Sequence, residues 1–139
     1  MNIAINGFGR IGRIVFRIAL EKGLNITAVN DVSEPRVLAY LLKYDTIYGR
    51  YKQKVSYGDD FLEVGNKKIK VLSVMEPSQL PWKEMKIDAV IESTGRFTKR
   101  EDAEKHLSAG AGRVFISAPA KSHDITLVPG VNLGEFRKE

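Results

Sequence analysis

The sequence contains no cysteine, which excludes more classes of protein than any other feature of its composition. Disulfide frameworks, zinc fingers and thiol nucleophiles all need this residue, so none of them is expected within the chain. Histidine is also scarce, since only His106 and His123 occur, and no cluster of carboxylates accompanies them. The sequence therefore predicts no metal site.

Long apolar runs are missing as well. No run of about 18 apolar residues is present, so the sequence predicts no membrane span. The first seven residues contain too few apolar side chains before a glycine to form a signal peptide. We therefore expect a cytoplasmic protein.

What is present is the composition of one ordinary globular domain: 139 residues, 43% hydrophobic and 28% charged. Lys and Arg total 22 against 17 for Asp and Glu, and the net charge of +5 raises nucleic acid as a partner. Much of this excess lies in residues 48–70, where alternating lysines are more typical of a protected sheet edge. Nucleic acid is therefore not expected. Five tyrosines near this segment could stack on bases, although burial against a sheet edge or a neighbouring subunit is the simpler explanation: Tyr40, Tyr44, Tyr48, Tyr51 and Tyr57.

Strands and helices alternate along most of the chain. Short apolar runs that end in glycine or polar residues predict strands, and apolar residues at helical spacing predict helices. The predicted strands cover 1–6, 25–30, 87–91, 113–117 and 124–128, and the predicted helices cover 10–22, 34–42 and 99–109.

Residues 50–72 break this alternation. Alternating apolar residues are separated by turn residues at 58–60 and 65–66, which predicts an antiparallel meander. The whole pattern predicts an α/β fold over residues 1–139. We expect a doubly wound, mostly parallel sheet with the meander as an excursion that covers a sheet edge or mediates assembly.

A glycine motif separates the first strand from the first helix, with glycines at Gly7, Gly9 and Gly12. The first permits a tight turn, the second lets the backbone approach a pyrophosphate, and the third allows close helix–strand packing. The helix N-terminus supplies free N–H groups and the positive end of a dipole. A glycine-rich turn without a ligand is the alternative, but the strand–turn–helix context favours a Rossmann-type dinucleotide site.

Asp31 ends the second predicted strand, 19 residues after Gly12. A carboxylate there can accept hydrogen bonds from both hydroxyls of an adenosine ribose and would repel a 2′-phosphate, which favours NAD over NADP. The alternative role is an N-cap for the following helix. Two other strand ends, residues 92–95 and 117–119, place small and hydroxylic residues at the same edge, although such residues are also common in turns.

Three further side chains have predicted roles outside the cofactor site. His106 falls in the last turn of a predicted helix, where a C-terminal cap contact is favoured over catalysis. His123 lies in a polar loop and is expected to be solvated. Trp82 follows a proline and is expected to be a packing anchor.

An ordered series of short motifs covers essentially the whole chain: residues 6–13, 30–31, 41–45, 49–50, 81–82, 92–95, 106–111, 117–119 and 129–132. Taken in this order, the motifs resemble the N-terminal NAD-binding domain of phosphorylating glyceraldehyde-3-phosphate dehydrogenases. Such a collinear set is far more specific than any single motif.

The resemblance implies cofactor contacts along the glycine motif and at several strand ends. Met75 stands where many members have an arginine near the adenine, so that contact reduces to backbone and thioether packing. The implied NAD-binding residues are Asn6, Gly7, Phe8, Gly9, Arg10, Ile11, Gly12, Asp31, Met75, Thr94, Gly95, Phe97 and Ser117.

The resemblance also implies a chemistry. In this family a cysteine thiolate attacks an aldehyde, hydride passes to NAD, and phosphate releases the thioester. The cysteine, its histidine partner and the groups that bind the sugar phosphate would follow after Glu139. We therefore expect no catalytic residue and no catalysis in this chain alone, and weak NAD binding. The full-length form is expected to be a homotetramer.

Two alternatives remain open from the sequence. The N-terminal part of an erythrose-4-phosphate dehydrogenase would look similar, because the discriminating residues should lie in the other half. A stand-alone nucleotide- or RNA-binding module is the alternative from another class.

Overall fold

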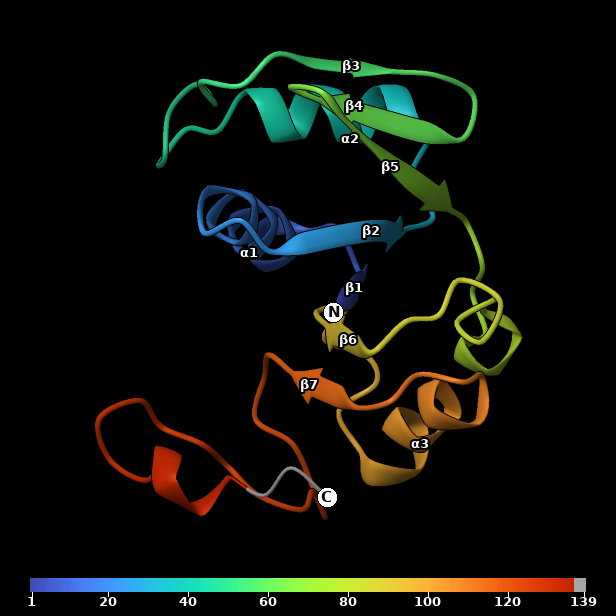
Figure 1. The fold of residues 1–139 in the computed structure, drawn as a ribbon, viewed down its shortest axis with the longest axis vertical. Coiled ribbons are helices and arrows are strands. Elements are labelled where there is room, and N and C mark those ends of the chain that lie inside the picture. The colour runs from blue at the N-terminus through green and yellow to red at the C-terminus, as the bar shows by residue number, and fades with distance from the viewer. Residues whose placement is uncertain (137–139) are drawn as a thin grey trace.

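All strands in residues 1–136, the part of the chain that the structure describes, belong to one seven-stranded sheet in a computed structural model (Figure 1). The strand order is β3-β4-β5-β2-β1-β6-β7, and β1, β2, β5, β6 and β7 run parallel. The last three residues of the predicted domain, 137–139, lie outside the described residues. The strands are β1 (Asn2–Asn6), β2 (Asn25–Asn30), β3 (Val55–Tyr57), β4 (Phe61–Val64), β5 (Lys67–Leu72), β6 (Ala89–Glu92) and β7 (Val114–Ile116).

Helices connect the parallel strands, as the alternating pattern predicted. They are α1 (Arg10–Glu21), α2 (Pro35–Lys43) and α3 (Arg100–Ser108), with short 3₁₀ turns at η1 (Pro77–Gln79) and η2 (Leu133–Glu135). Pro35 opens α2, where its missing N–H costs no hydrogen bond. The predicted α/β, doubly wound and mostly parallel fold is confirmed.

The core has two parts because β1 alternates its side chains between the faces of the sheet. Ile3 and Ile5 pack with residues of α1 and α2, including Phe16 and Leu38, in one apolar cluster. Ala4 faces the other way and packs in a second cluster with Trp82 and its neighbours. Figure 1 shows α1 on one side of the strands and α3 on the other.

The predicted antiparallel meander is confirmed, and it is continuous with the parallel strands. β5 pairs with β4 in antiparallel register and with β2 in parallel register, so the hairpins extend the parallel sheet at one edge. The strand β3 forms that edge. The lysines of this region alternate with the buried residues Ile69 and Val71 along β5, as expected for a strand that covers a core on one face.

The predicted strand at 124–128 is wrong. This segment is irregular, because the Asn132 side chain takes hydrogen bonds that a neighbouring strand would need. Its Oδ1 accepts the Val128 N–H at 2.8 Å, and its Nδ2 donates to the Thr126 carbonyl at 2.9 Å. The Val131 N–H closes the turn on the Val128 carbonyl. Local side-chain capping thus replaces strand pairing.

Candidate cofactor site

A cleft of about 220 Å³ opens where the parallel strands end. β1 is the point at which the strand order reverses, since its neighbours β2 and β6 lead in opposite directions through the sheet. Ligands of open α/β sheets bind at such a switch point. The cleft is lined by Asn6, Gly7, Gly9, Asn30, Asp31, Val32, Val74, Met75, Ser93, Thr94, Arg96 and Phe97.

The three glycines of the motif have different structural reasons to be glycine. Gly7 has φ +89°, and a Cβ there would lie 2.6 Å from the Thr94 backbone nitrogen. A Cβ on Gly12 would lie 2.1 Å from the Gly7 carbonyl oxygen, so this glycine serves helix–strand packing. Gly9 is different, because a Cβ there would meet no atom of the described chain within 4 Å. The chain's own packing therefore does not require glycine at position 9, whereas a ligand in the cleft would.

The first turn of α1 is open to an anion. Gly9 is the N-cap residue, and no side chain of residues 1–136 caps the helix there. No acidic side chain lies in the first turn. Arg13, one turn along, donates from Nη1 to the Phe8 carbonyl at 3.0 Å, and burial lowers its pKa below the usual range. The glycine loop is thus fixed while the N–H groups of the first turn point to the cleft entrance.

Asp31 lies at the end of β2 and holds two backbone segments. Its Oδ2 accepts the Phe8 N–H at 2.8 Å, and its Oδ1 accepts the Ser33 N–H at 2.9 Å. The bond to Ser33 is an Asx turn before α2, whose N-cap residue is Glu34. Asp31 is therefore not the N-cap of α2. Each oxygen keeps a further lone pair for a ligand hydroxyl.

The structure brings together most of the predicted cofactor residues, but not all of their side chains. Those that line the cleft are Asn6, Gly7, Gly9, Asp31, Met75, Thr94 and Phe97. The Phe8 side chain is buried in the core against Phe16, with ring centroids 5.3 Å apart, so only its backbone faces the loop. Gly12 is buried in packing, whereas Arg10 and Ile11 are exposed on α1, and Gly95 is exposed beside Thr94.

The cleft also contains residues outside the implied NAD-binding set, of which Ser93 belongs to the strand end 92–95 that was predicted at this edge. Ser93 donates from Oγ to the Gly7 carbonyl at 2.7 Å and so joins the β6 loop to the glycine loop. Asn30 and Arg96 come from segments next to predicted site residues, and this adjacency was the available signal. Val32 and Val74 carry no comparable signal, since their apolar side chains are typical of packing. Ser117, one of the implied NAD-binding residues, is not among the residues that line the cleft, and it donates from Oγ to the Glu92 carbonyl at 3.1 Å.

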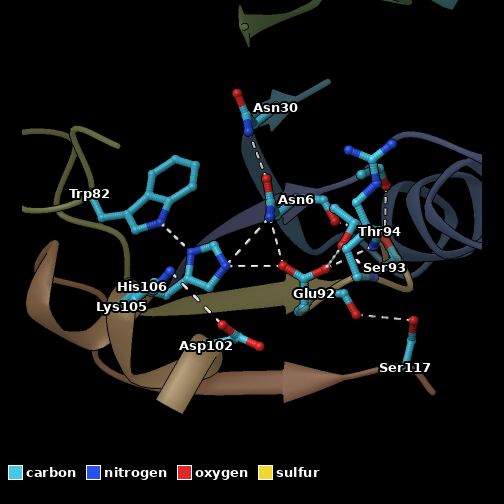
Figure 2. Close-up of polar contacts among 12 residues, drawn as sticks. Asn6, Asn30, Trp82, Glu92, Ser93, Thr94, Asp102, Lys105, His106 and Ser117 are labelled. Atoms are coloured by element: carbon cyan, nitrogen blue, oxygen red, sulfur yellow. Dashed lines mark hydrogen bonds and ion pairs between the residues drawn. The ribbon is translucent and has the colours of Figure 1, made fainter. Parts of the chain in front are cut away.

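A buried carboxylate connects the two loops on either side of the cleft. Glu92, at the end of β6, accepts the Asn6 Nδ2–H at 2.6 Å through Oε2 and the Thr94 backbone N–H at 2.8 Å through Oε1. The Thr94 hydroxyl donates to the same Oε1. Figure 2 shows Glu92 at the centre of these contacts. A buried charge is tolerated only with such complete hydrogen bonding.

The prediction for His106 is wrong. The residue lies in the last turn of α3 as expected, but its side chain makes no cap contact and is fully buried. Its Nε2 lies 3.0 Å from Glu92 Oε2, and its Nδ1 accepts the Trp82 Nε1–H at 3.0 Å (Figure 2). Trp82 is buried as predicted, yet it is also a hydrogen-bond donor. His123 lies exposed in its loop, as predicted.

The tyrosines give a mixed result. Tyr51 is buried, but Tyr40, Tyr44, Tyr48 and Tyr57 are each about half exposed or more. Three of them line a second hollow on α2 and β3, away from the glycine loop. Its lining consists of Arg36, Ala39, Tyr40, Lys43, Tyr44, Arg50, Lys54, Val55 and Tyr57.

Residues 1–136 contain neither a membrane-spanning helix nor a cluster of metal ligands. No helix in residues 1–136 is both long enough and apolar enough to cross a membrane. Within the same range, no three His, Asp or Glu side chains gather where they could hold a metal ion.

The fold and the cleft define a dinucleotide-binding domain of the Rossmann type. Comparison with known families gives the particular one, because residues 1–100 match the family described as "Glyceraldehyde 3-phosphate dehydrogenase, NAD binding domain". The chain belongs to this family, and NAD is the cofactor of the family domain.

Curated relatives agree with this assignment over nearly the whole chain. The glyceraldehyde-3-phosphate dehydrogenase of Streptomyces coelicolor is 54% identical over 138 residues, which are 98% of this chain and 41% of that protein. The protein of the same name from Geobacillus stearothermophilus is 53% identical, again over 98% of this chain and 41% of its own length. The Thermotoga maritima protein is 49% identical, over 99% of this chain and 42% of its length. The chain thus spans about two fifths of these relatives.

Proposed function

We propose that the cleft binds NAD as the cofactor part of a glyceraldehyde-3-phosphate dehydrogenase. The observation that carries the proposal is made at Gly9, which borders the cleft: a Cβ added there would meet no atom within 4 Å beyond its chain neighbours. A glycine that the fold does not need, at the N-cap of a 12-residue helix without a side-chain cap, fits the close approach of a pyrophosphate.

The other predicted residues fit the rest of the dinucleotide. Asp31 holds the loop that carries Phe8 and has acceptor capacity left for the ribose hydroxyls. Val32, Met75 and Phe97 give the adenine an apolar wall. Asn6, Thr94 and Ser117 lie at or just after the ends of β1, β6 and β7. In this proposal Asn6 and Ser117 face the nicotinamide end, and Thr94 lies by the adenosine half. The proposed set also includes Gly7, Arg10, Ile11, Gly12 and Gly95 as the loop backbone.

The reaction of the whole protein is part of the proposal. NAD, when bound, accepts the hydride of an aldehyde that is oxidised to an acyl phosphate. Binding of the sugar-phosphate substrate needs residues beyond this chain, and so does the thiol nucleophile, because the chain contains no cysteine. The complete protein forms a homotetramer. The 139 residues form a single NAD-binding domain that does not catalyse alone. The comparisons do not favour the erythrose-4-phosphate or RNA-binding alternatives.

Calorimetric titration of the 139-residue chain with NAD, and separately with NADP, tests the cofactor proposal. We expect saturable binding of NAD with one site per chain and weaker binding of NADP, because Asp31 repels a 2′-phosphate. Equal binding of both cofactors, or binding of NADP alone, would contradict the proposed role of Asp31. No binding of either would contradict the proposed cleft.

A further inference from the structure

We propose that Trp82 and His106, neither of which lines the cleft, position its cofactor-binding loops through Glu92. The inference rests on the proposed NAD function of the cleft. It assigns Trp82 and His106 as positioning residues, because they act only through other side chains.

The geometry determines which nitrogen of His106 carries the proton. The Trp82 indole is donor only, and its Nε1–H points at His106 Nδ1 from 3.0 Å. Nδ1 must therefore be an acceptor without a proton. The proton of the neutral ring lies on Nε2, which donates it to Glu92 Oε2 at 3.0 Å. Trp82 thus selects the tautomer that can hold Glu92.

Glu92 transmits this constraint to both sides of the cleft. Its Oε2 also accepts from Asn6, the last residue of β1, and its Oε1 accepts from Thr94 in the loop after β6. Asn6 and Thr94 both line the cleft. With four donors on two oxygens, the carboxylate has little freedom to rotate, so the separation of the two loops is fixed.

The chain of contacts continues to the other two cleft loops. Asn6 Oδ1 accepts the Asn30 Nδ2–H at 2.7 Å. Asn30 in turn binds both backbone groups of Val74, donating to its carbonyl at 2.8 Å and accepting its N–H at 2.9 Å. One continuous network therefore joins Trp82 to the carboxyl ends of β1, β2 and β6 and to the segment after β5.

Trp82 and His106, at one end of the network, lie away from the cleft. Trp82 and His106 are both fully buried, and their rings meet edge to edge with centroids 6.3 Å apart. Trp82 belongs to the apolar cluster on the face of the sheet opposite α1. An effect of these residues on NAD affinity would accordingly come through Glu92 and not through contact.

The variant Trp82→Phe tests this, because it keeps an aromatic ring and removes the one N–H donor to His106. We expect NAD affinity to fall about three- to tenfold, as for other changes that act through a supporting network. Nitrogen-15 NMR of His106 in the unliganded wild-type chain should show an unprotonated Nδ1 and a protonated Nε2. In Trp82→Phe the Nδ1 resonance should shift because it loses its hydrogen-bond donor, and the Thr94 amide resonance should move.

Ile87→Val is the matched control. Ile87 lies in the same apolar cluster as Trp82 and donates its backbone N–H to the Trp82 carbonyl, but its side chain makes no polar contact. This variant should lose stability and keep wild-type NAD affinity.

The wild-type chain gives a second test that does not depend on a variant folding. Trp82 is the only tryptophan, so its indole N–H gives a single resonance. Coupling between sites is reciprocal, so NAD should shift this resonance and slow its exchange with solvent.

The outcomes separate the two proposals. A protonated Nδ1 in the wild type, or unweakened NAD binding by a folded Trp82→Phe, would overturn the positioning role alone. An indole N–H resonance that does not shift at saturating NAD would also overturn the positioning role. A wild-type chain that binds no NAD would overturn the proposed function, and the positioning role with it.

Discussion

At the scale of single residues, the glycine loop separates what the fold requires from what a ligand requires. Gly9→Ala adds a methyl group that meets no atom of the described chain within 4 Å, at φ −72° and ψ −159°, which alanine adopts freely. We expect the free energy of unfolding to change by less than about 1 kcal/mol. NAD affinity should fall about tenfold or more, because the methyl group occupies the approach of the pyrophosphate. Denaturant unfolding and calorimetry measure the two effects.

Gly7→Ala is the contrasting variant. Its methyl group would meet the Thr94 backbone at 2.6 Å with the residue held at φ +89°. Unfolding free energy should therefore fall by about 2 kcal/mol or more. If Gly9→Ala were destabilised as much as Gly7→Ala, position 9 would be structural, and the main observation behind the proposed function would be lost.

Asp31 gives a second residue-scale prediction. Asp31→Asn removes the charge while it keeps an oxygen that can accept one of the two backbone N–H groups. We expect weaker NAD binding and a preference for NAD over NADP that shrinks about tenfold, since like-charge repulsion of the 2′-phosphate is gone. Competition titrations with both cofactors measure the ratio. Asp59→Asn, in the exposed β3–β4 turn, should leave the ratio unchanged.

Some contacts of single residues could be predicted from the sequence and others could not. The glycine spacing and Asp31 were found because one local segment, strand to helix, contains their whole signal. The Trp82–His106–Glu92 contacts join residues 14 and 24 positions apart, in the turn before β6, in α3 and at the end of β6. A lone histidine in a polar helix gives no sign of such partners. The expected cap contact of His106 followed from its position in the helix alone. The side chain is instead buried, where it contacts Trp82 and Glu92.

At the scale of elements, the turn after α2 is held by one carboxylate. Asp45 Oδ1 accepts the N–H groups of Ile47 at 2.8 Å and Tyr48 at 2.9 Å. These two bonds, from Tyr48 and then Ile47, lower the pKa of Asp45 from its ordinary value of 3.8. Nearby Arg10 and Arg17 add to this effect. The folded turn thus favours the ionised carboxyl.

The sign of the pH dependence follows. A carboxyl with a depressed pKa in the folded state stabilises the turn above its unfolded pKa, and the contribution disappears as the pH falls through the folded pKa. Below pH 3.8 we therefore expect the amide resonances of Ile47 and Tyr48 to shift together with protonation of Asp45. NMR titration measures both. Asp45→Asn should remove the shift, and an Asp45 that titrates above 3.8 would contradict the prediction.

Elements were predictable where a buried face imposes a period. The bounds of the strand at 25–30 and of the helix at 10–22 were predicted to within one residue, because the spacing of apolar residues reflects burial against the sheet. The segment 124–128 has a similar apolar composition but no neighbouring strand, and Asn132 takes its hydrogen bonds instead. Residues 50–72 were correctly predicted as hairpins. Their continuity with the parallel sheet depends on β5 pairing with β2, which no local pattern specifies.

At the scale of the whole molecule, the structure shows where the excess positive charge lies and what the absence of cysteine implies. The net charge of +5 has much of its excess in the segment just before β3, at Arg50, Lys52 and Lys54, whereas the cleft carries Asp31 and Arg96 among mainly neutral residues. The missing cysteine has the most direct consequence. Under the proposed function, the domain binds the cofactor of a thioester-forming oxidation, and because it contains no cysteine it does not supply the thiol nucleophile.

This separation of binding from chemistry gives the last prediction. The purified 139-residue chain, mixed with NAD, glyceraldehyde 3-phosphate and inorganic phosphate, should produce no NADH, although we expect calorimetry to show that it binds NAD. Iodoacetamide supplies the control, because it alkylates cysteine thiols and the chain has none. Any NADH formation that iodoacetamide abolishes comes from a contaminating dehydrogenase. NADH formation that survives alkylation and scales with the concentration of the chain would show a nucleophile other than cysteine, and would contradict the proposal that this domain holds the cofactor and leaves the chemistry to residues elsewhere.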